Sequence, residues 1–252
     1  MRKPPERAEL AHAPAAAVVL QGQLQVVGTP IGNLGDLSPR ALAALREAEV
    51  IACEDTRRTG LLLHKLGLPN RAQGGAALVS YHEHNEASRT LQLLQDVRQG
   101  RRVVLVSDSG MPGISDPGAR LVASARAEGL PATVIPGPCA AVVALVGTGL
   151  AGAFTFVGFL PRKPGARNSV WQQALSQPQL HAVVYESPQR VLKTLEELTE
   201  LAPDRTVWLA RELTKLHEEW LHGRPSELLR QLATRAGAMK GECVLVVAGA
   251  VD

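Results

Sequence analysis

The sequence predicts an α/β protein with a mostly parallel sheet, because strand-like and helix-like segments alternate from Leu24 onward. The apolar runs are short and end at clusters of Gly, Pro, Ser and Asp, from which helical patterns begin. The chain has 252 residues, of which 45% are hydrophobic. This is enough apolar material for one large domain or two small ones.

The first half of the chain alternates most regularly. Ser38 begins a helix as its N-cap, with Pro39 at the first helical position. Further helices are predicted over 59–66, 86–98 and 116–128. The predicted strands span 24–28, 50–53, 78–81, 102–106 and 133–135. Repeated strand–helix units of this kind imply a parallel sheet that is covered by helices on both faces.

The second half has shorter connections and is compatible with a mixed sheet. Ser187 and Pro188 open a helix whose leucines form one apolar stripe. The other predicted elements are strands over 154–158, 181–185, 206–210 and 242–248, and helices over 139–146 and 225–235. A boundary near Gly137 divides the chain into a tail over residues 1–22, a first α/β domain over 23–136 and a second over 137–252.

The tail is rich in Ala and Pro and is predicted to be disordered. A signal peptide is disfavoured because Glu6, Glu9, His12 and Pro14 interrupt its short apolar run. We find no run of 18 or more apolar residues of the kind that crosses a membrane.

Composition narrows the class of protein further. The net charge of +3 permits an anionic partner without requiring one. Only 3% of the residues are aromatic, which argues against an RNA binder that works mainly by stacking bases. Cys53, Cys139 and Cys243 lie far apart without metal-ligand spacing, which indicates a reduced, cytoplasmic protein.

The loop over 107–118 is the strongest candidate for a ligand site. It follows the apolar strand 102–106 and contains three glycines, which allow a ligand to approach the backbone closely. Open α/β proteins bind ligands at the carboxyl ends of their strands. Asp108 in this loop can accept a hydrogen bond from a hydroxyl or ammonium group. The alternative is a βα loop without a ligand.

Other polar motifs end the first three strands. The turn over 28–35 has neither the spacing of a dinucleotide fingerprint nor the lysine of a phosphate-binding loop, so it is either a cleft wall or a simple turn. Glu-Asp-Thr-Arg over 54–57 is read as a helix cap, a substrate contact or both. The histidines in 82–86 share one face, but no third metal ligand is positioned beside them.

Two kinds of charged segment occur in the second half. Residues 160–167 carry three cations and no acid, and form either a phosphate-binding loop or a solvated one. Residues 185–188 and 210–217 place charged groups at strand ends, where they either face the first domain across a cleft or form simple ion pairs.

Eight short motifs follow one another between residues 23 and 249. They are Val-Gly-Thr-Pro-Ile-Gly-Asn, Glu-Asp-Thr-Arg, His-x-His-Asn-Glu, Ser-Asp-Ser-Gly-x-Pro-x-Ile-Ser-Asp-Pro-Gly, Pro-Gly-Pro-Cys-Ala, Gly-Phe-Leu-Pro, Tyr-Glu-Ser and Arg-Glu-Leu-Thr-Lys. Together they resemble the tetrapyrrole-methylase superfamily of S-adenosylmethionine-dependent methyltransferases. The second and last motifs resemble the branch that methylates ribose 2′-hydroxyls in small-subunit ribosomal RNA rather than the porphyrin-ring methylases.

The resemblance implies a fold of two α/β domains with the methyl donor in the cleft between them, and a homodimer. It implies S-adenosylmethionine as the cofactor and a reaction that needs no metal. The positions that match donor contacts of the family are Pro30, Asp108, Ser109, Gly110, Pro112, Ile114, Ser115, Ala140, Ala141, Phe159 and Leu213. The chain departs from the family in its longer N-terminal tail and in stopping soon after the last strand.

The implied reaction is methyl transfer to the 2′-oxygen of a cytidine in 16S ribosomal RNA, within a 30S subunit or a late precursor. The candidates for catalysis are Glu186, Lys215, Asp55 and Glu212, with Glu186 and Lys215 ranked first. Lys215 is either a donor that holds phosphate or orients the ribose, or a base if burial makes it neutral. The candidates for RNA contact are Arg57, His84, Asn85, Arg162, Lys163, Arg167 and Arg211. The alternatives are a corrinoid- or porphyrin-ring methyltransferase and a non-catalytic module that binds RNA or a nucleotide.

Overall fold

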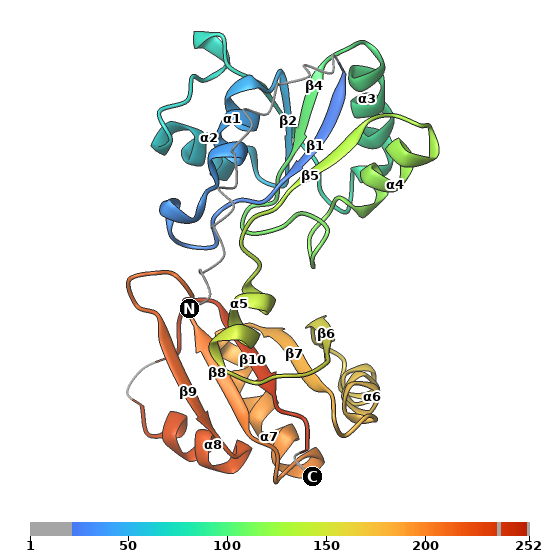
Figure 1. The fold of residues 1–252 in the computed structure, drawn as a ribbon. Coiled ribbons are helices and arrows are strands. Elements are labelled where there is room, and N and C mark those ends of the chain that lie inside the picture. Colours follow the sequence, from blue (N-terminus) through green and yellow to red (C-terminus); the bar gives the residue numbers. More distant parts are fainter. Residues whose placement is uncertain (1–21, 236–237, 251–252) are drawn as a thin grey trace, which may run out of the picture.

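The computed structural model describes residues 22–235 and 238–250, which fold around two five-stranded sheets (Figure 1). The predicted α/β class with two sheet-based units is confirmed. The predicted disordered tail lies outside the described residues, apart from Gly22.

The first sheet is entirely parallel, as the strand–helix alternation predicts. Its order is β3-β2-β4-β1-β5. The strands are β1 (Gln23–Val27), β2 (Val50–Cys53), β3 (Ala77–Ser80), β4 (Arg102–Leu105) and β5 (Ala132–Ile135). All four residues of β2 are buried, as expected for a strand covered on both faces.

Four helices cover the first sheet. They are α1 (Pro39–Glu47), α2 (Thr56–Lys65), α3 (Glu86–Arg98) and α4 (Ala119–Ala127). Leu45 of α1 and Leu63 of α2 belong to one buried cluster, whereas Leu93 of α3 and Leu121 of α4 belong to another. The two helix pairs therefore pack on opposite faces of the sheet. The parallel strands consequently end at one common edge, where the polar motifs gather.

The second sheet is mixed and has the order β6-β7-β10-β8-β9. Only β6 and β7 run parallel, while β10 is antiparallel to β7 and β8. The strands are β6 (Phe154–Phe159), β7 (His181–Glu186), β8 (Val207–Arg211), β9 (Glu219–Gly223) and β10 (Cys243–Val247). The helices are α5 (Ala140–Gly147), α6 (Pro164–Leu175), α7 (Val191–Leu201) and α8 (Pro225–Ala233).

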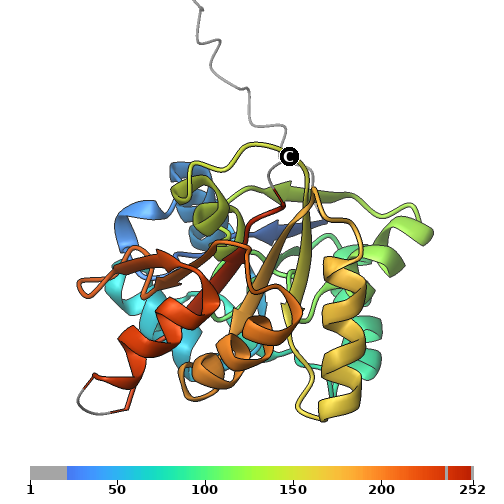
Figure 2. The ribbon, with the colours of Figure 1, turned by 90° about the horizontal axis from the view of Figure 1, so that it is seen from below.

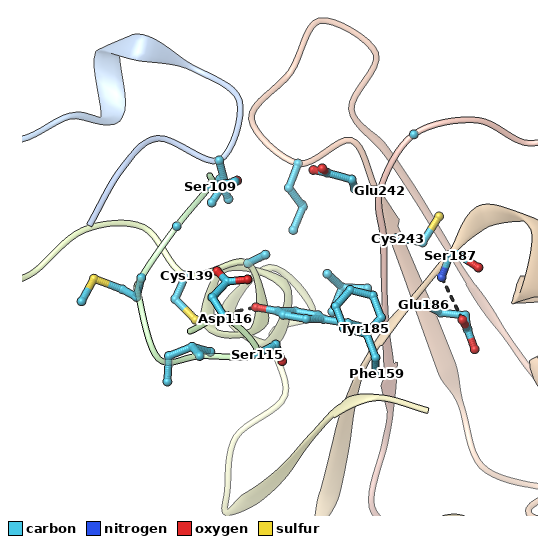
Figure 3. A pocket seen from close by; sticks show the side chains of 18 of the residues that line it. Ser109, Ser115, Asp116, Cys139, Phe159, Tyr185, Glu186, Ser187, Glu242 and Cys243 are labelled. Atoms are coloured by element: carbon cyan, nitrogen blue, oxygen red, sulfur yellow. Dashed lines mark hydrogen bonds between the residues drawn. The ribbon is translucent and has the colours of Figure 1, made fainter. Parts of the chain in front are cut away.

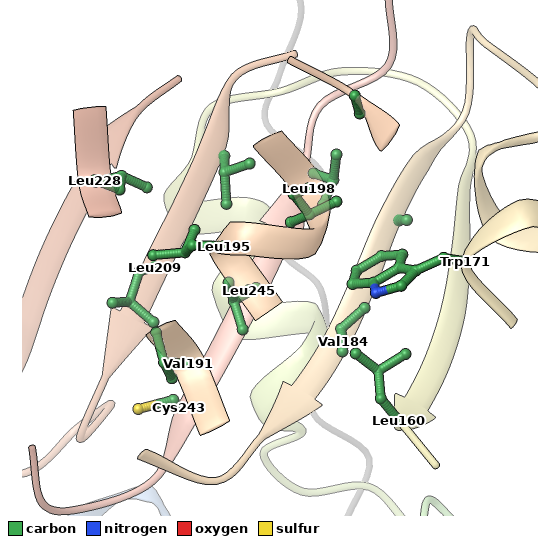
Figure 4. Close-up of a cluster of buried hydrophobic side chains, with 14 of the residues drawn as sticks. Leu160, Trp171, Val184, Val191, Leu195, Leu198, Leu209, Leu228, Cys243 and Leu245 are labelled. Carbon is green, nitrogen blue, oxygen red and sulfur yellow. The ribbon is translucent and has the colours of Figure 1, made fainter. Parts of the chain in front are cut away.

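The two faces of the second sheet have different cores. Leucines of α7 and α8 pack with Leu209, Leu245 and Trp171 in the largest buried cluster (Figure 4). Helix α5 packs on the other face, against Val183 and Val246 (Figure 2). Because α5 follows directly after β5, this face is turned toward the first sheet. Three short 3-10 helices complete the described elements: η1 (Leu34–Asp36), η2 (Arg71–Gln73) and η3 (Pro188–Arg190).

Several element boundaries differ from the prediction, for local reasons. Helix α2 begins at Thr56 because the side chain of Asp55 accepts from the Arg57 amide and caps it. Helix α4 begins only at Ala119, after Gly118 at φ 142°. Strand β9 and helix α6 were not predicted, and α6 replaces the end of the expected loop 160–167.

The two sheets are joined through Pro-Gly-Pro at 136–138, between β5 and α5. Here two glycines allow close contact, because a Cβ on Gly28 would lie 2.6 Å from the Cα of Gly137. The division of the chain into domains at residue 137 stays a prediction. Among the described helices, none combines the length and apolar character that a membrane crossing requires.

Candidate functional site

A cavity of about 320 Å³ lies where the loops of the first sheet meet the second sheet (Figure 3). Most of the residues that the family resemblance points to line it. They are Ser109, Gly110, Ile114, Ser115, Ala140, Phe159 and Leu213. They come from the loop after β4, the start of α5, the end of β6 and the loop after β8. The structure thus brings together segments that are up to a hundred residues apart.

The walls of the cavity are largely apolar. Ile31 enters from the turn after β1, and Val244 comes from β10. Phe159 meets the ring of Tyr185 edge to face, with their centroids 5.5 Å apart. Such walls suit the apolar part of a small ligand and keep water away from a reacting centre.

Tyr185 connects the second sheet to the start of α5. Its hydroxyl accepts a hydrogen bond from the Ala141 amide at 3.1 Å. Burial raises the pKa of this phenol, so it stays protonated at neutral pH. The side chain of the N-cap residue, Cys139, makes no capping hydrogen bond, and Ala140 at the first turn of α5 lines the cavity. The N-terminus of a helix favours an anionic ligand group such as a carboxylate.

The remaining residues predicted to bind the donor do not line the cavity. They are Pro30, Asp108, Pro112 and Ala141. Their neighbours Ile31 and Met111 line it instead, and the Ala141 amide is occupied by Tyr185. The Asp108 carboxylate accepts from the Asp55 amide at 3.0 Å and from Arg58 at 3.3 Å. Asp108 therefore links the loop after β4 to α2, and its contact with the donor stays a prediction.

Glu186 lies at the end of β7, but its carboxylate points away from the cavity (Figure 3). It accepts from Arg167 at 3.1 Å, from Arg190 at 2.6 Å and from Thr194 at 2.9 Å. The Ser187 amide donates a fourth hydrogen bond. Both oxygens have hydrogen-bond partners, and this arrangement indicates a structural carboxylate; the catalytic role of Glu186 stays a prediction.

Arg167, which was predicted to contact RNA, is only 2% exposed. It lies on α6, where Nε donates to Glu197 and Nη2 donates to Thr194. Together with Glu186 and Arg190 these residues form a buried group that we call the ion cluster. The helical start at Pro164 turns Arg167 inward, and RNA phosphates cannot reach it.

Lys215 forms ion pairs with Glu212 at 2.8 Å and with Glu242 at 2.9 Å. Partial burial opposes the charge, but these two hydrogen bonds hold the pKa of Lys215 above its ordinary value. The condition set for Lys215 as a base, a buried and neutral amine, is therefore not met in this structure, and its role as a hydrogen-bond donor stays a prediction. Glu212 is held in the same pair, and hydrogen bonds from Lys215 and the Glu242 amide outweigh burial and lower the pKa of Glu212. Asp55 caps α2, and its hydrogen bonds with Arg57 lower the pKa of Asp55.

The loop that holds Lys215 also reaches the first sheet. The Asn33 amide donates to the Thr214 hydroxyl at 3.1 Å. A Cβ on Gly32 would collide with Lys215 and would lie 2.7 Å from the Thr214 hydroxyl. Thr214 itself adopts the left-handed backbone conformation, with φ 64°. These contacts close one rim of the cavity and depend on a glycine at position 32.

Some predicted RNA contacts remain accessible. Arg162 and Lys163 are exposed in the connection between β6 and α6, and the Arg57 side chain is 91% exposed. His84 is exposed beside Glu83. The remaining two are engaged elsewhere. The Asn85 side chain bonds within its own turn to Ser80 and His82, and Arg211 pairs with Glu219 at 2.9 Å.

Asp116 is a cavity residue that the sequence reasoning missed. It lines the cavity from the loop after β4 and points toward the Tyr185 hydroxyl (Figure 3). Burial, together with the carboxylates of Glu54 and Asp108, raises the pKa of Asp116 to about 6. Its signal in the sequence, Asp before Pro-Gly, was interpreted as the start of a helix. That helix begins three residues later, so Asp116 stays in the loop.

Comparison with known proteins agrees with this geometry. Residues 23–229 match the family model of the tetrapyrrole (corrin/porphyrin) methylases. The chain belongs to this family. The family predicted from the eight motifs is thereby confirmed.

Curated relatives cover nearly the whole chain. One from Hydrogenobaculum sp. is 43% identical over 226 residues, which are 89% of this chain and 95% of that protein. One from Thermotoga maritima is 41% identical and covers 90% and 99%. One from Escherichia coli O157:H7 is 43% identical and covers 91% and 78%. All three carry the name ribosomal RNA small subunit methyltransferase I.

Solved structures share the fold at lower identity. The methyltransferase CobJ has a TM-score of 0.68 and 22% identity, with 91% of this chain and 95% of that chain covered. A uroporphyrin-III C-methyltransferase from Thermus thermophilus, in complex with S-adenosylhomocysteine, has a TM-score of 0.57 and 20% identity, with 90% and 97% covered. These likenesses establish the two-sheet fold.

Proposed function

We propose that this chain transfers a methyl group from S-adenosylmethionine to the ribose 2′-oxygen of a cytidine in 16S ribosomal RNA. The observation that carries the proposal is the sequence identity of 41–43%, over about nine tenths of the chain, with proteins named ribosomal RNA small subunit methyltransferase I. The cavity between the two sheets supplies a matching site.

The residues around the cavity fit the methyl donor. Its apolar walls, among them Ile31 and Phe159, suit an adenine ring and methylene groups. The N-terminus of α5, where Ala140 lines the cavity, suits the donor's carboxylate, and the hydroxyls of Ser109 and Ser115 can bond its polar groups. The donor supplies a methyl group on a positively charged sulfur, which makes that carbon electrophilic.

The chain's own contribution is to position the reactants and exclude water. Loops from both sheets enclose the cavity, and Thr214 ties one of them to the turn after β1. Holding the acceptor oxygen in line with the methyl group turns a bimolecular encounter into a step within one complex.

Exposed cations support an RNA acceptor. Arg162 and Lys163 are exposed and can approach phosphates, and the Arg57 side chain is 91% exposed although it pairs with Asp55 at 3.1 Å. The corrinoid or porphyrin alternative has the support of fold alone, since those structures are less than 25% identical to this chain. The acceptor is placed in a 30S subunit or late precursor, in the cytoplasm, where the three free cysteines stay reduced.

A homodimer is part of the proposal. Helix α5 exposes Val142 and Val146, the latter 73% exposed. The edge strands before and after it expose Val134 and Phe154. Branched and aromatic side chains exposed on one helix and two sheet edges are typical of a protein interface.

Mapping of 2′-O-methyl groups in 16S RNA, with and without the gene, tests the function. We expect one cytidine to lose its methyl group in the deletion strain and to regain it when the purified protein acts on the deletion strain's 30S subunits. An unchanged map would refute the proposal.

A further inference from the structure

A second, more polar cavity adjoins the one described above. It measures about 700 Å³, and Ser115 and Asp116 belong to the walls of both cavities. The two spaces thus share this part of the loop after β4 as a common wall. A residue that faces both spaces can contact a ligand in either of them.

The other walls of the second cavity come from the strand ends of the first sheet. Glu54 follows β2, His82 and His84 follow β3, and Arg120 lies in the first turn of α4. Arg120 is held by Glu86 at 3.1 Å. Carboxylates, imidazoles and a guanidinium are groups that bond the hydroxyls, phosphates and base edges of a nucleotide. This wall contrasts with the apolar wall of the first cavity.

Asp116 is surrounded by groups that leave its carboxylate basic. Burial and the negative charges of Glu54 and Asp108, which follow β2 and β4, raise the pKa of Asp116. On the side of the first cavity it faces Tyr185 and, beyond the phenol, the thiol of Cys139.

The nearby cations have partners of their own. Arg58 pairs with Asp108, and Arg120 pairs with Glu86. With the pKa of Asp116 near 6, the group is ionised at neutral pH yet more basic than an ordinary aspartate.

We propose that the second cavity receives the acceptor nucleotide and that Asp116 is the catalytic residue that removes the proton from its 2′-hydroxyl. This inference rests on the proposed function. The O–H bond breaks as Asp116 takes the proton, and the 2′-oxygen bonds the methyl carbon. The carbon–sulfur bond breaks and its electron pair stays on sulfur, which becomes a neutral thioether. The proton leaves Asp116 to solvent afterwards.

The substitution Asp116→Asn tests the catalytic role. Calorimetric titration with S-adenosylmethionine and with 30S subunits from the deletion strain is expected to give affinities within about threefold of the parent. Single-turnover methylation is expected to fall roughly 10²–10⁴-fold, the usual range for general acid–base catalysis. The parental rate is expected to rise with pH to a plateau above about 6, and Asp116→Asn to lose that step.

The matched control is Asp204→Asn, an exposed acid-to-amide change at a side chain that is 84% exposed. It is expected to keep the parental rate and pH profile. A parental protein that fails to methylate the subunits would refute the proposed function. A parental rate with Asp116→Asn, while the parent is active, would overturn only this inference.

A second variant tests the location of the acceptor. Ala119 lines the second cavity and not the first, so Ala119→Trp fills the polar space alone. We expect the KM for 30S subunits to rise at least tenfold while the Kd for S-adenosylmethionine stays unchanged. An unchanged KM would overturn the placement of the acceptor in this cavity.

Discussion

Glu186 and Asp116 are carboxylates that border the same cavity, and their surroundings are opposite. Glu186 is fully buried in the ion cluster, where two guanidinium groups, a hydroxyl and an amide satisfy both oxygens. Asp116 is only half-buried and faces two further carboxylates. Two arginines balance the charge of the Glu186 carboxylate. Burial and the two neighbouring carboxylates raise the pKa of Asp116, which makes it the more basic group.

The difference shows what each region contributes. The ion cluster joins α6, β7 and α7, and so holds the end of β7, where Tyr185 lines the cavity. The loop after β4 is tied to α2 through Asp108, but among the described residues Asp116 in the same loop has no ion pair, and its pKa is raised at the cavity wall. An ionisable residue with a shifted pKa in a cleft is a candidate for function. A buried carboxylate whose oxygens all have ion-pair or hydrogen-bond partners indicates a structural role.

The largest expected effect comes from breaking the ion cluster. Arg167→Met leaves Glu186 and Glu197 without their central partner, and losing one member of a buried pair costs about 3–5 kcal/mol. Urea denaturation is expected to show a loss of this size. Lys163→Met, an exposed change nearby, is expected to alter the free energy of unfolding by less than about 0.5 kcal/mol. Equal stability of the two variants would contradict a structural role for the cluster.

The next effect concerns the rim that closes the cavity. Gly32→Ala drives a methyl group into Lys215 and the Thr214 hydroxyl, and overpacking of this kind costs about 1–3 kcal/mol. Because the rim borders the cavity proposed to hold the donor, calorimetry is expected to show S-adenosylmethionine binding weakened about tenfold, which corresponds to about 1.4 kcal/mol. Gly165→Ala is the control, since a Cβ there meets nothing within 4 Å. Unchanged donor affinity in Gly32→Ala would show that the rim is not part of the site.

A smaller change in the free energy of unfolding is expected for Asp116→Asn, and it is a gain rather than a loss of stability. Its folded pKa of about 6 lies above the ordinary value of 3.8, so the native state binds the proton more tightly than the unfolded chain. Stability from this group is present below pH 4 and is lost as pH rises through 6. Asp116→Asn removes that loss, and we expect about 1 kcal/mol more stability at pH 8, after allowance for solvent screening, and no gain at pH 4.

Thermal unfolding of Asp116→Asn at the two pH values measures this difference. A loss of stability at pH 8 would mean that Asp116, like Glu186, is a structural carboxylate. The two acids would then have the same role, and the contrast drawn between them would be wrong.

Much of the fold was predictable because local signals agree with the tertiary structure. Ser38 and Pro39 cap α1 as their residue types indicate, and the apolar β2 is buried on both faces. Helix α6 was missed because its first turn begins with Pro-Gly, a pair that is also typical of loops. Strand β9 was missed because Glu-Trp-Leu-His-Gly at the sheet edge lacks a clear alternation.

The site was predictable as a set of loops but not as a set of roles. The motifs located the loop after β4 and the start of α5 because strand ends and glycines are local features. Whether an acid is neutralised depends on partners distant in sequence, such as Arg167 for Glu186, nineteen residues away. No spacing rule links those residues, so Glu186 and Asp116 could be told apart only once the fold was known.

The smallest effect is expected on binding to 30S subunits, from two exposed cations that lie outside the ion cluster. Arg162 and Lys163 are exposed, unlike Arg167 five residues on, so they are the two cations of the segment that can meet RNA. Replacing both with Gln is expected to weaken binding to 30S subunits a few-fold and to reduce the slope of log affinity against log salt by up to about two phosphate contacts. Donor affinity and stability are expected to stay at parental values. Filter binding over a range of salt concentrations measures the slope, and an unaltered slope would assign both side chains to solvent.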